Sequence, residues 1–245
     1  MKKLGFTVAE VLITMGIIGI ISALTLPTFV TDYRKQMYSK SLVSAVADFE
    51  NAMMIMMKKE GIDDLFYSEA WTAIRDANAF LLSANSNDDV IENFMGKITK
   101  ILPIESYKTD EWEFYPLDGK TELSEDRLVR FKTKQGVVYG ITIRQPFSQE
   151  PIDEKIALMN NSEYRNQAAR LVVIDINGEN MPNREGRDIF YYELSTDGHL
   201  YPYGSKEQCL YSNNTYHDPR RFCVEGRQGE YCAAYLRTNN YQMDY

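Results

Sequence analysis

The residues best suited to hold a metal ion lie in one stretch, positions 175–188. Asp175, Asn177, Asn183 and Asp188 offer side-chain oxygens there. Oxygen ligands are those that calcium prefers, so the stretch predicts a calcium site. The alternative is a purely structural loop, because Asn and Asp favour turns for local backbone reasons. The spacing matches no full calcium-binding pattern, so both interpretations stay open, and calcium is the one cofactor that the sequence suggests.

The chain contains few residues of the types that most often carry out catalysis. Its 245 residues include two histidines, His199 and His217, and three cysteines, and no motif pairs a nucleophile with a base. We therefore expect no enzymatic activity, although scattered residues can converge in space. The net charge of -8, from 27 Lys and Arg against 35 Asp and Glu, gives no reason to expect a nucleic-acid partner.

The N-terminus carries an apolar run of membrane length. Residues 11–30 contain no charge, and Lys2 and Lys3 precede them. A helix of roughly twenty apolar residues spans a bilayer, and the lysines keep its start cytoplasmic, so the rest of the chain is translocated. A secretory signal peptide would have a shorter apolar region with a cleavage site after it. A plain membrane anchor fits the length but gives no reason for Glu10, which costs free energy near the bilayer.

The residues around Glu10 resemble a known processing motif. Residues 5–10 read GFTVAE and lead into the apolar run. This resembles the prepilin-type motif of type IV pilins and type II secretion pseudopilins: a short basic leader, a Gly, a Phe, three residues, a Glu and a long apolar helix. The resemblance implies cleavage between Gly5 and Phe6 by a membrane prepilin peptidase, and N-methylation of Phe6. It also implies that Glu10 pairs with the new Phe6 amine of a neighbouring subunit; otherwise Glu10 only marks the membrane boundary.

The three cysteines, Cys209, Cys223 and Cys232, lie near the C-terminus. A translocated chain meets an oxidising compartment, so at least one disulfide is expected, with one thiol left over. Many pilins close a C-terminal loop with a disulfide, and the resemblance extends this to the present chain. Cys223–Cys232 is favoured because Gly226 and Gly229 make a tight return easy. Cys209–Cys232 is a close alternative.

Two kinds of sequence pattern, one helical and one typical of strands, predict the elements that position these residues. Apolar residues at spacings of four and three in residues 32–60 predict an amphipathic helix that continues the membrane segment. Residues 6–60 are therefore predicted as one helix, kinked or locally melted at Pro27 and ended at Gly61. Four segments with strand patterns follow, at 127–133, 137–143, 170–174 and 189–194.

These elements predict an α+β fold in which about four antiparallel strands pack on the second half of the long helix. A sheet on such a helix is also the pilin fold, which the resemblance implies independently. The predicted organisation is a leader at 1–5, a helix at 6–60 with about 11–30 in the membrane, and a soluble pilin-like domain at 61–245.

The predicted function is that of a prepilin subunit that is cleaved, N-methylated and polymerised through its N-terminal helix into a type IV pilus-like or pseudopilus fibre. The alternative is a single-pass, membrane-anchored extracytoplasmic binding protein that does not polymerise. The resemblance implies three partners: prepilin peptidase, other pilin or pseudopilin subunits, and an inner-membrane assembly platform. It places the chain in the cytoplasmic (inner) membrane with its soluble domain outside, and then in a fibre at the periplasm or cell surface.

Overall fold

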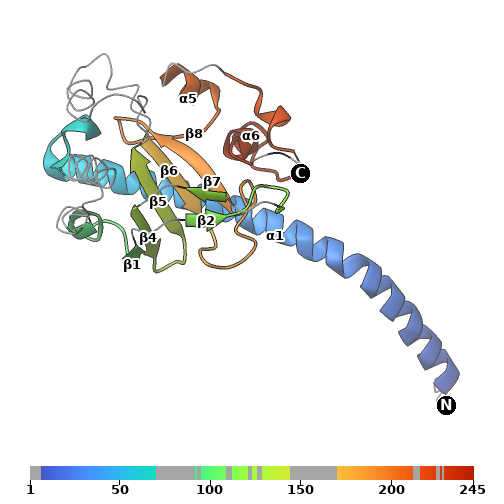
Figure 1. Ribbon diagram of the computed structural model, residues 1–245. Coiled ribbons are helices and arrows are strands. Elements are labelled where there is room, and N and C mark those ends of the chain that lie inside the picture. The colour runs from blue at the N-terminus through green and yellow to red at the C-terminus, as the bar shows by residue number, and fades with distance from the viewer. Residues whose placement is uncertain are drawn as a thin grey trace.

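The computed structural model describes residues 7–69, 92, 95–108, 112–120, 123–125, 129–143, 170–211, 216–224, 227 and 229–245. One long helix runs from the N-terminus, and an antiparallel sheet packs against its C-terminal half (Figure 1). The helical elements are α1 (Val8–Glu60), η1 (Leu65–Tyr67), α5 (Lys206–Tyr211), η2 (Pro219–Arg221) and α6 (Cys232–Thr238). The strands are β1 (Ile104–Lys108), β2 (Trp112–Phe114), β3 (Leu123–Glu125), β4 (Val129–Thr133), β5 (Val138–Ile143), β6 (Arg170–Asp175), β7 (Ile189–Leu194) and β8 (Leu200–Pro202).

Helix α1 is continuous over 53 residues and passes through Pro27 without melting, contrary to that part of the prediction. Its N-terminal half curves instead (Figure 1). Proline has no N–H to donate to the preceding turn, and the hydroxyls of Thr25 and Thr31 bond to carbonyls four residues earlier, a pattern that bends helices. The helix ends at Glu60 because Gly61 adopts the left-handed conformation, with φ of 67°, and its N–H bonds to the Met57 carbonyl.

The main sheet has six antiparallel strands in the order β1-β4-β5-β6-β7-β8, and β2 pairs with β3 in a separate two-stranded sheet. The prediction of about four strands is therefore too low. The four predicted strand segments correspond to β4, β5, β6 and β7, and the two edge strands, β1 and β8, are additional. Four of the five β1 side chains are exposed, so β1 has no alternating pattern, and β8 is only three residues long. A strand as polar as β1 or as short as β8 forms because a neighbouring strand offers its backbone.

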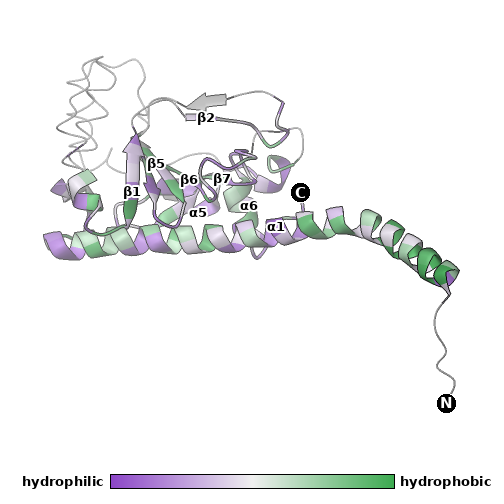
Figure 2. Ribbon diagram, turned by 90° about the horizontal axis from the view of Figure 1, so that it is seen from below, coloured by the Kyte–Doolittle hydropathy of each residue, from purple (hydrophilic) through white to green (hydrophobic). Residues whose placement is uncertain are grey.

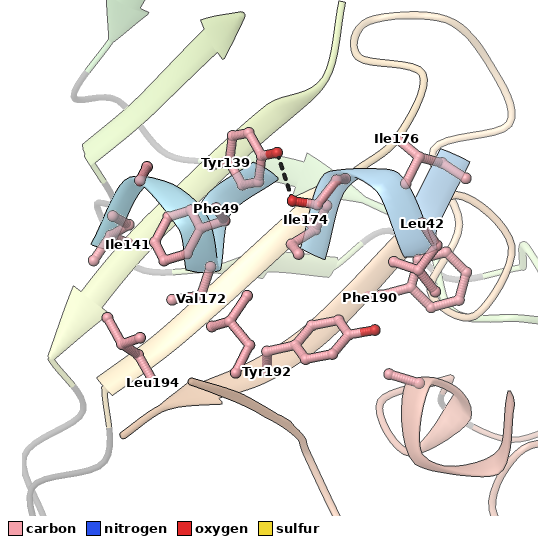
Figure 3. Packing of buried hydrophobic residues seen from close by; sticks show 14 of the residues in the cluster. Leu42, Phe49, Tyr139, Ile141, Val172, Ile174, Ile176, Phe190, Tyr192 and Leu194 are labelled. Atoms are coloured by element: carbon pink, nitrogen blue, oxygen red, sulfur yellow. Dashed lines mark hydrogen bonds between the residues drawn. The ribbon is translucent and has the colours of Figure 1, made fainter. Parts of the chain in front are cut away.

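The helix side of the sheet forms the main core. Buried α1 residues occur at the predicted spacing and include Leu42, Phe49 and Met53, whereas Val46 is only partly buried. Phe49 packs on Tyr139 of β5 with ring centroids 5.3 Å apart, and the Tyr139 hydroxyl donates to a carbonyl of α1 at 2.9 Å (Figure 3). Burial on one face of the helix therefore holds α1 to the sheet.

The opposite face of the sheet is also covered. A second apolar cluster lies there, formed by Trp112, Val138, Leu171, Val173, Ile189 and Tyr191. As a result all six residues of β7 are buried and the strand shows no inside–outside alternation.

Candidate functional site

The first described residues form a helix cap built around Glu10. Thr7 is the N-cap of α1, and its backbone N–H and its hydroxyl both donate to the Glu10 carboxylate, at 2.8 and 2.7 Å. The Glu10 N–H returns a bond to the Thr7 hydroxyl at 3.3 Å. This capping box satisfies backbone donors that have no partner within the helix. Gly5 and Phe6, the predicted cleavage and methylation positions, lie outside the described residues.

The part of α1 that follows the cap leaves its apolar side chains exposed. Its apolar residues from Val8 to Val30 are exposed; Val8 is 77% exposed, Leu24 is 74% exposed and Phe29 is 69% exposed. In Figure 2 this half of α1 is coloured hydrophobic along nearly all of its turns. The half that packs against the sheet alternates between hydrophobic and hydrophilic residues. By length and composition α1 is the candidate membrane span among the described residues. Such a surface is stable only in lipid or against other apolar surfaces.

The four residues predicted to bind calcium come together in the turn between β6 and β7. The Asp175 carboxylate accepts from the Asn177 and Gly178 N–H groups at 3.1 and 2.8 Å. The Asp188 carboxylate accepts from the Asn183 and Arg184 N–H groups at 2.9 and 2.6 Å. These bonds are those of a structural loop, in which carboxylates hold the backbone of tight turns.

Two features of the same turn favour a cation. Burial raises the pKa of Asp175 well above its usual range, and the nearby charge of Asp188 raises it further. Burial also raises the pKa of Asp188. The side-chain oxygen of Asn177 is buried and has no hydrogen-bond partner in the described structure. However, the described residues contain no group of three or more His, Cys, Asp or Glu side chains placed to hold a metal. The calcium site therefore stays a prediction.

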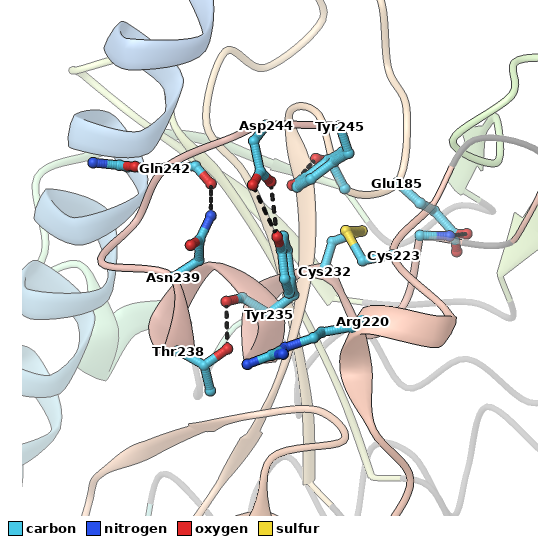
Figure 4. Close-up of a disulfide and its surroundings, with 12 residues drawn as sticks. Glu185, Arg220, Cys223, Cys232, Tyr235, Thr238, Asn239, Gln242, Asp244 and Tyr245 are labelled. Atoms are coloured by element: carbon cyan, nitrogen blue, oxygen red, sulfur yellow. Dashed lines mark hydrogen bonds between the residues drawn. A yellow bond between two sulfur atoms is a disulfide. The ribbon is translucent and has the colours of Figure 1, made fainter.

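The C-terminal region is tied together by a disulfide between Cys223 and Cys232, whose Cα atoms are 4.8 Å apart (Figure 4). Cys209 is a buried thiol on α5. Gly229 precedes α6 and lies so close to Glu185 that a Cβ would stand 2.4 Å from the Glu185 carbonyl carbon. Its N–H donates to the Glu185 carboxylate at 3.0 Å. The glycine thus lets the disulfide loop dock onto the turn before β7.

A groove that the sequence analysis did not identify lies between α1 and the C-terminal residues 240–244. Its volume is about 680 Å³, and its walls include Asp32, Lys35, Ser39, Lys40 and Asp244. Figure 4 shows the C-terminal residues beside α1, near the point where the helix leaves the domain in Figure 1. Its two walls come from opposite ends of the chain, so no local pattern indicates it.

A second hollow, of about 350 Å³, lies on the other face of the sheet, between β1, β4 and the 175–183 turn. Lys108 and Arg130 line it together with Trp112 of β2. The Arg130 guanidinium lies over the Trp112 ring at 5.5 Å, and Lys108 pairs with Glu179 at 3.3 Å. Acidic side chains, among them Glu113 and Asp175, line it as well, so the hollow offers charges of both signs and an aromatic surface to a small ligand.

No protein-family model matches this chain, and no match is found among curated proteins or solved structures. Its class is therefore defined by its own features. It is an α+β protein with one long N-terminal helix, whose first half is a candidate membrane span and whose second half is the spine of an antiparallel-sheet domain. A disulfide closes the C-terminal loop of that domain.

Proposed function

We propose that this protein is a prepilin-like subunit, cleaved between Gly5 and Phe6, N-methylated at Phe6 and polymerised through its N-terminal helix. The observation that carries the proposal is the division of α1. One unbroken helix has an apolar half whose side chains are exposed in the part of the chain that the structure describes, and a half that is buried on one face against the sheet. A rigid helix of this kind can leave the bilayer and pack against helices of other subunits without refolding the domain that it carries.

The Thr7–Glu10 cap suits this role. Before assembly, Glu10 is satisfied within its own chain by Thr7. A carboxylate has more acceptor positions than these two bonds occupy, so it can also receive an amine from a neighbouring N-terminus. In lipid such a charge pair would set the register between subunits, because an unpaired charge there costs several kcal/mol.

An anchored binding protein that does not polymerise is the second candidate. The hollow lined by Lys108, Arg130 and Trp112 favours it, because an anchored receptor needs a ligand site on its exposed domain. Processing separates the two candidates. A plain anchor keeps residues 1–5, whereas a processed subunit begins with methylated Phe6.

The test is the mass and N-terminal sequence of the protein recovered from the cell envelope and from sheared surface fibres. We expect the mature chain to begin at methylated Phe6 and to occur in the fibres. Gly5→Leu should stay at precursor mass in the membrane, because a bulky side chain blocks the close approach of a protease to the backbone. Normal processing of Gly5→Leu would refute the cleavage assignment.

Polymerisation is tested separately at Glu10. Glu10→Val should insert and be processed normally, because residues 5 and 6 are unchanged, yet its amount in fibres should fall. Thr7→Ala is the matched control, since it removes the hydroxyl of the cap and keeps the carboxylate. If both variants lose fibres equally, capping rather than charge pairing explains the effect.

A further inference from the structure

The hollow between β1, β4 and the turn after β6 has its floor on the face of the main sheet that points away from α1. In the sheet Asp175 is opposite Val138, and Val138 is opposite Lys132 on the next strand. Residues directly opposite each other share one face of a sheet, so these three side chains form a row across the floor. Figure 2 shows β2 on the same side of the sheet, where Trp112 covers part of that face.

Asp175 leaves one carboxylate oxygen without a hydrogen bond in this hollow. Its side chain lines the hollow and is only 2% exposed. The Asn177 and Gly178 N–H groups both donate to Oδ1, and no donor reaches Oδ2 in the part of the chain that the structure describes. The nearby carboxylate of Asp188 adds negative charge at the same end. A buried carboxylate oxygen without a donor costs free energy, which a bound cationic donor would remove.

Lysine side chains supply the opposite charge at the other end of the hollow, on β4 and β1. Lys132 pairs with Glu105 at 3.6 Å, and Lys108 pairs with Glu179 at 3.3 Å. The two glutamate side chains are 56% and 78% exposed, and pairs as exposed as these contribute little to stability. The carboxylate of a ligand can therefore replace a glutamate at either lysine. Glu113, at the rim, is also exposed to solvent.

We propose that this hollow binds a free α-amino acid with an apolar side chain, with its ammonium at Asp175 and its carboxylate at Lys132 and Arg130. Arg130 lies two residues before Lys132 on β4, on the same face of the sheet, with its guanidinium over the Trp112 ring at 5.5 Å. A simple anion would be repelled by the acidic end and a simple cation by the basic end, whereas a zwitterion is attracted by both.

The size of the hollow fits this class of ligand. Neighbouring strands are about 4.8 Å apart, so the backbones of Asp175 and Lys132, two strands apart, are separated by about 10 Å. The side chains that reach in from both ends shorten this gap to one that a small ligand can span. Val138 lies between the two ends and offers an apolar contact, together with Trp112. The volume of about 350 Å³ is near the lower limit for ligand pockets.

The test is equilibrium dialysis of the full chain, in mild detergent with a calcium chelator at neutral pH, against radiolabelled L-leucine. Two unlabelled competitors each keep one charge. Leucinamide has the ammonium and lacks the carboxylate, and isocaproate has the carboxylate and lacks the ammonium. We expect leucine to bind and each competitor to be about tenfold weaker than unlabelled leucine, because each loses a hydrogen bond to a charged group. Absence of leucine binding, or a competitor as strong as leucine, would overturn the proposal.

Two variants test the two ends separately. Lys132→Gln should weaken leucine binding several-fold without weakening leucinamide. Asp175→Asn keeps an oxygen for the N–H groups of the turn, and should weaken leucine without weakening isocaproate. The control is Lys134→Gln, the same change at an exposed lysine in the turn after β4, outside the hollow. Unchanged leucine binding in either variant, or an equal loss in Lys134→Gln, contradicts the proposal. The site does not depend on processing or polymerisation, so a negative result leaves the test of those steps unaffected.

Discussion

At the scale of single residues, carboxylates act in three different ways in this molecule. Glu10 caps an exposed helix end. Glu185 is buried and accepts from the Tyr191 hydroxyl at 2.7 Å and from the Gly229 N–H, which joins the disulfide loop to the sheet. Asp175 and Asp188 are buried close enough for their charges to oppose each other. Burial and the charge of Asp188 raise the pKa of Asp175, so this pair carries an electrostatic penalty that depends on pH.

Asp175→Asn tests that penalty. A carboxyl whose pKa is raised in the folded state binds its proton more tightly when folded, so its contribution to stability is lost as pH rises from about 4 toward neutrality. Asparagine keeps an oxygen for the Asn177 and Gly178 N–H groups and has no charge. We expect the free energy of unfolding of the variant, relative to the wild type, to increase from about pH 4 to about pH 7.

The measurement is denaturant unfolding of the full chain in mild detergent at several pH values. Asp118→Asn is the control for net charge, because Asp118 also caps a turn, through the Lys120 N–H. A difference between Asp175→Asn and the wild type that stays constant with pH would contradict the assigned penalty.

The calcium prediction for the same turn is tested by a separate experiment. A bound cation would stabilise the native state by mass action and offset the repulsion of the two carboxylates. If the calcium prediction holds, chelation lowers the melting temperature of the wild type, and Asp175→Asn and Asp188→Asn lose that dependence. Identical melting curves with calcium and with chelator would leave the turn as a purely structural loop.

At the scale of elements, the two halves of the continuous helix α1 differ in the faces that they bury. The half under the sheet buries a single face, which includes Phe49 at 0% exposure, and leaves residues such as Met54 exposed. The half before it exposes apolar side chains on every face. Residues near the boundary between the halves line the groove beside the C-terminal residues.

Phe49→Ala should show how strongly the sheet holds the helix. Deleting a fully buried phenylalanine costs about 3–5 kcal/mol of unfolding free energy through lost contacts and the cavity left behind. Met54→Ala, on the exposed face five residues later, should cost less than about 1 kcal/mol. Both values come from denaturant unfolding in detergent. Equal costs would show that α1 is not anchored through the face that packs on Tyr139.

At the scale of the whole molecule, the apolar N-terminal part of α1, residues 8–30, projects away from the sheet and is here called the stem (Figure 1). The core cluster includes no residue before Tyr38, so the stem makes no contribution to the core described. The domain is closed by long-range links, among them the Tyr245 hydroxyl bonded to the Gly186 carbonyl at 2.6 Å. Stem and domain should therefore respond independently to substitution.

Ile18→Lys and Ile55→Lys test this independence. Ile18 lies in the stem and Ile55 on the exposed side of α1 within the domain, and both side chains are exposed. A lysine near the centre of a membrane helix costs about 3 kcal/mol on insertion scales, so Ile18→Lys should shift the protein out of the carbonate-washed membrane pellet. Ile55→Lys should stay in the pellet. Loss of both variants from the pellet, or of Ile55→Lys alone, would contradict insertion through residues 11–30.

The sequence by itself determined the features that depend on near neighbours. The apolar run, the helix through Glu60 with its stop at Gly61, the buried stripe around Phe49 and the α+β class all follow from spacings of a few residues. The favoured cysteine pair, Cys223 and Cys232, also lies only nine residues apart.

Tertiary structure alone decided what depends on partners far along the chain. β1 carries no alternating pattern and β8 is only three residues long, and both edge strands form because β4 and β7 offer them hydrogen bonds. Asp175 is buried because both faces of the sheet are covered, and this burial raises its pKa. The groove at Ser39 needs the C-terminal residues folded back onto α1. Sequence spacing encodes the local geometry of one element, whereas pairing, burial and hollows arise from contacts between elements, which no short window of sequence contains.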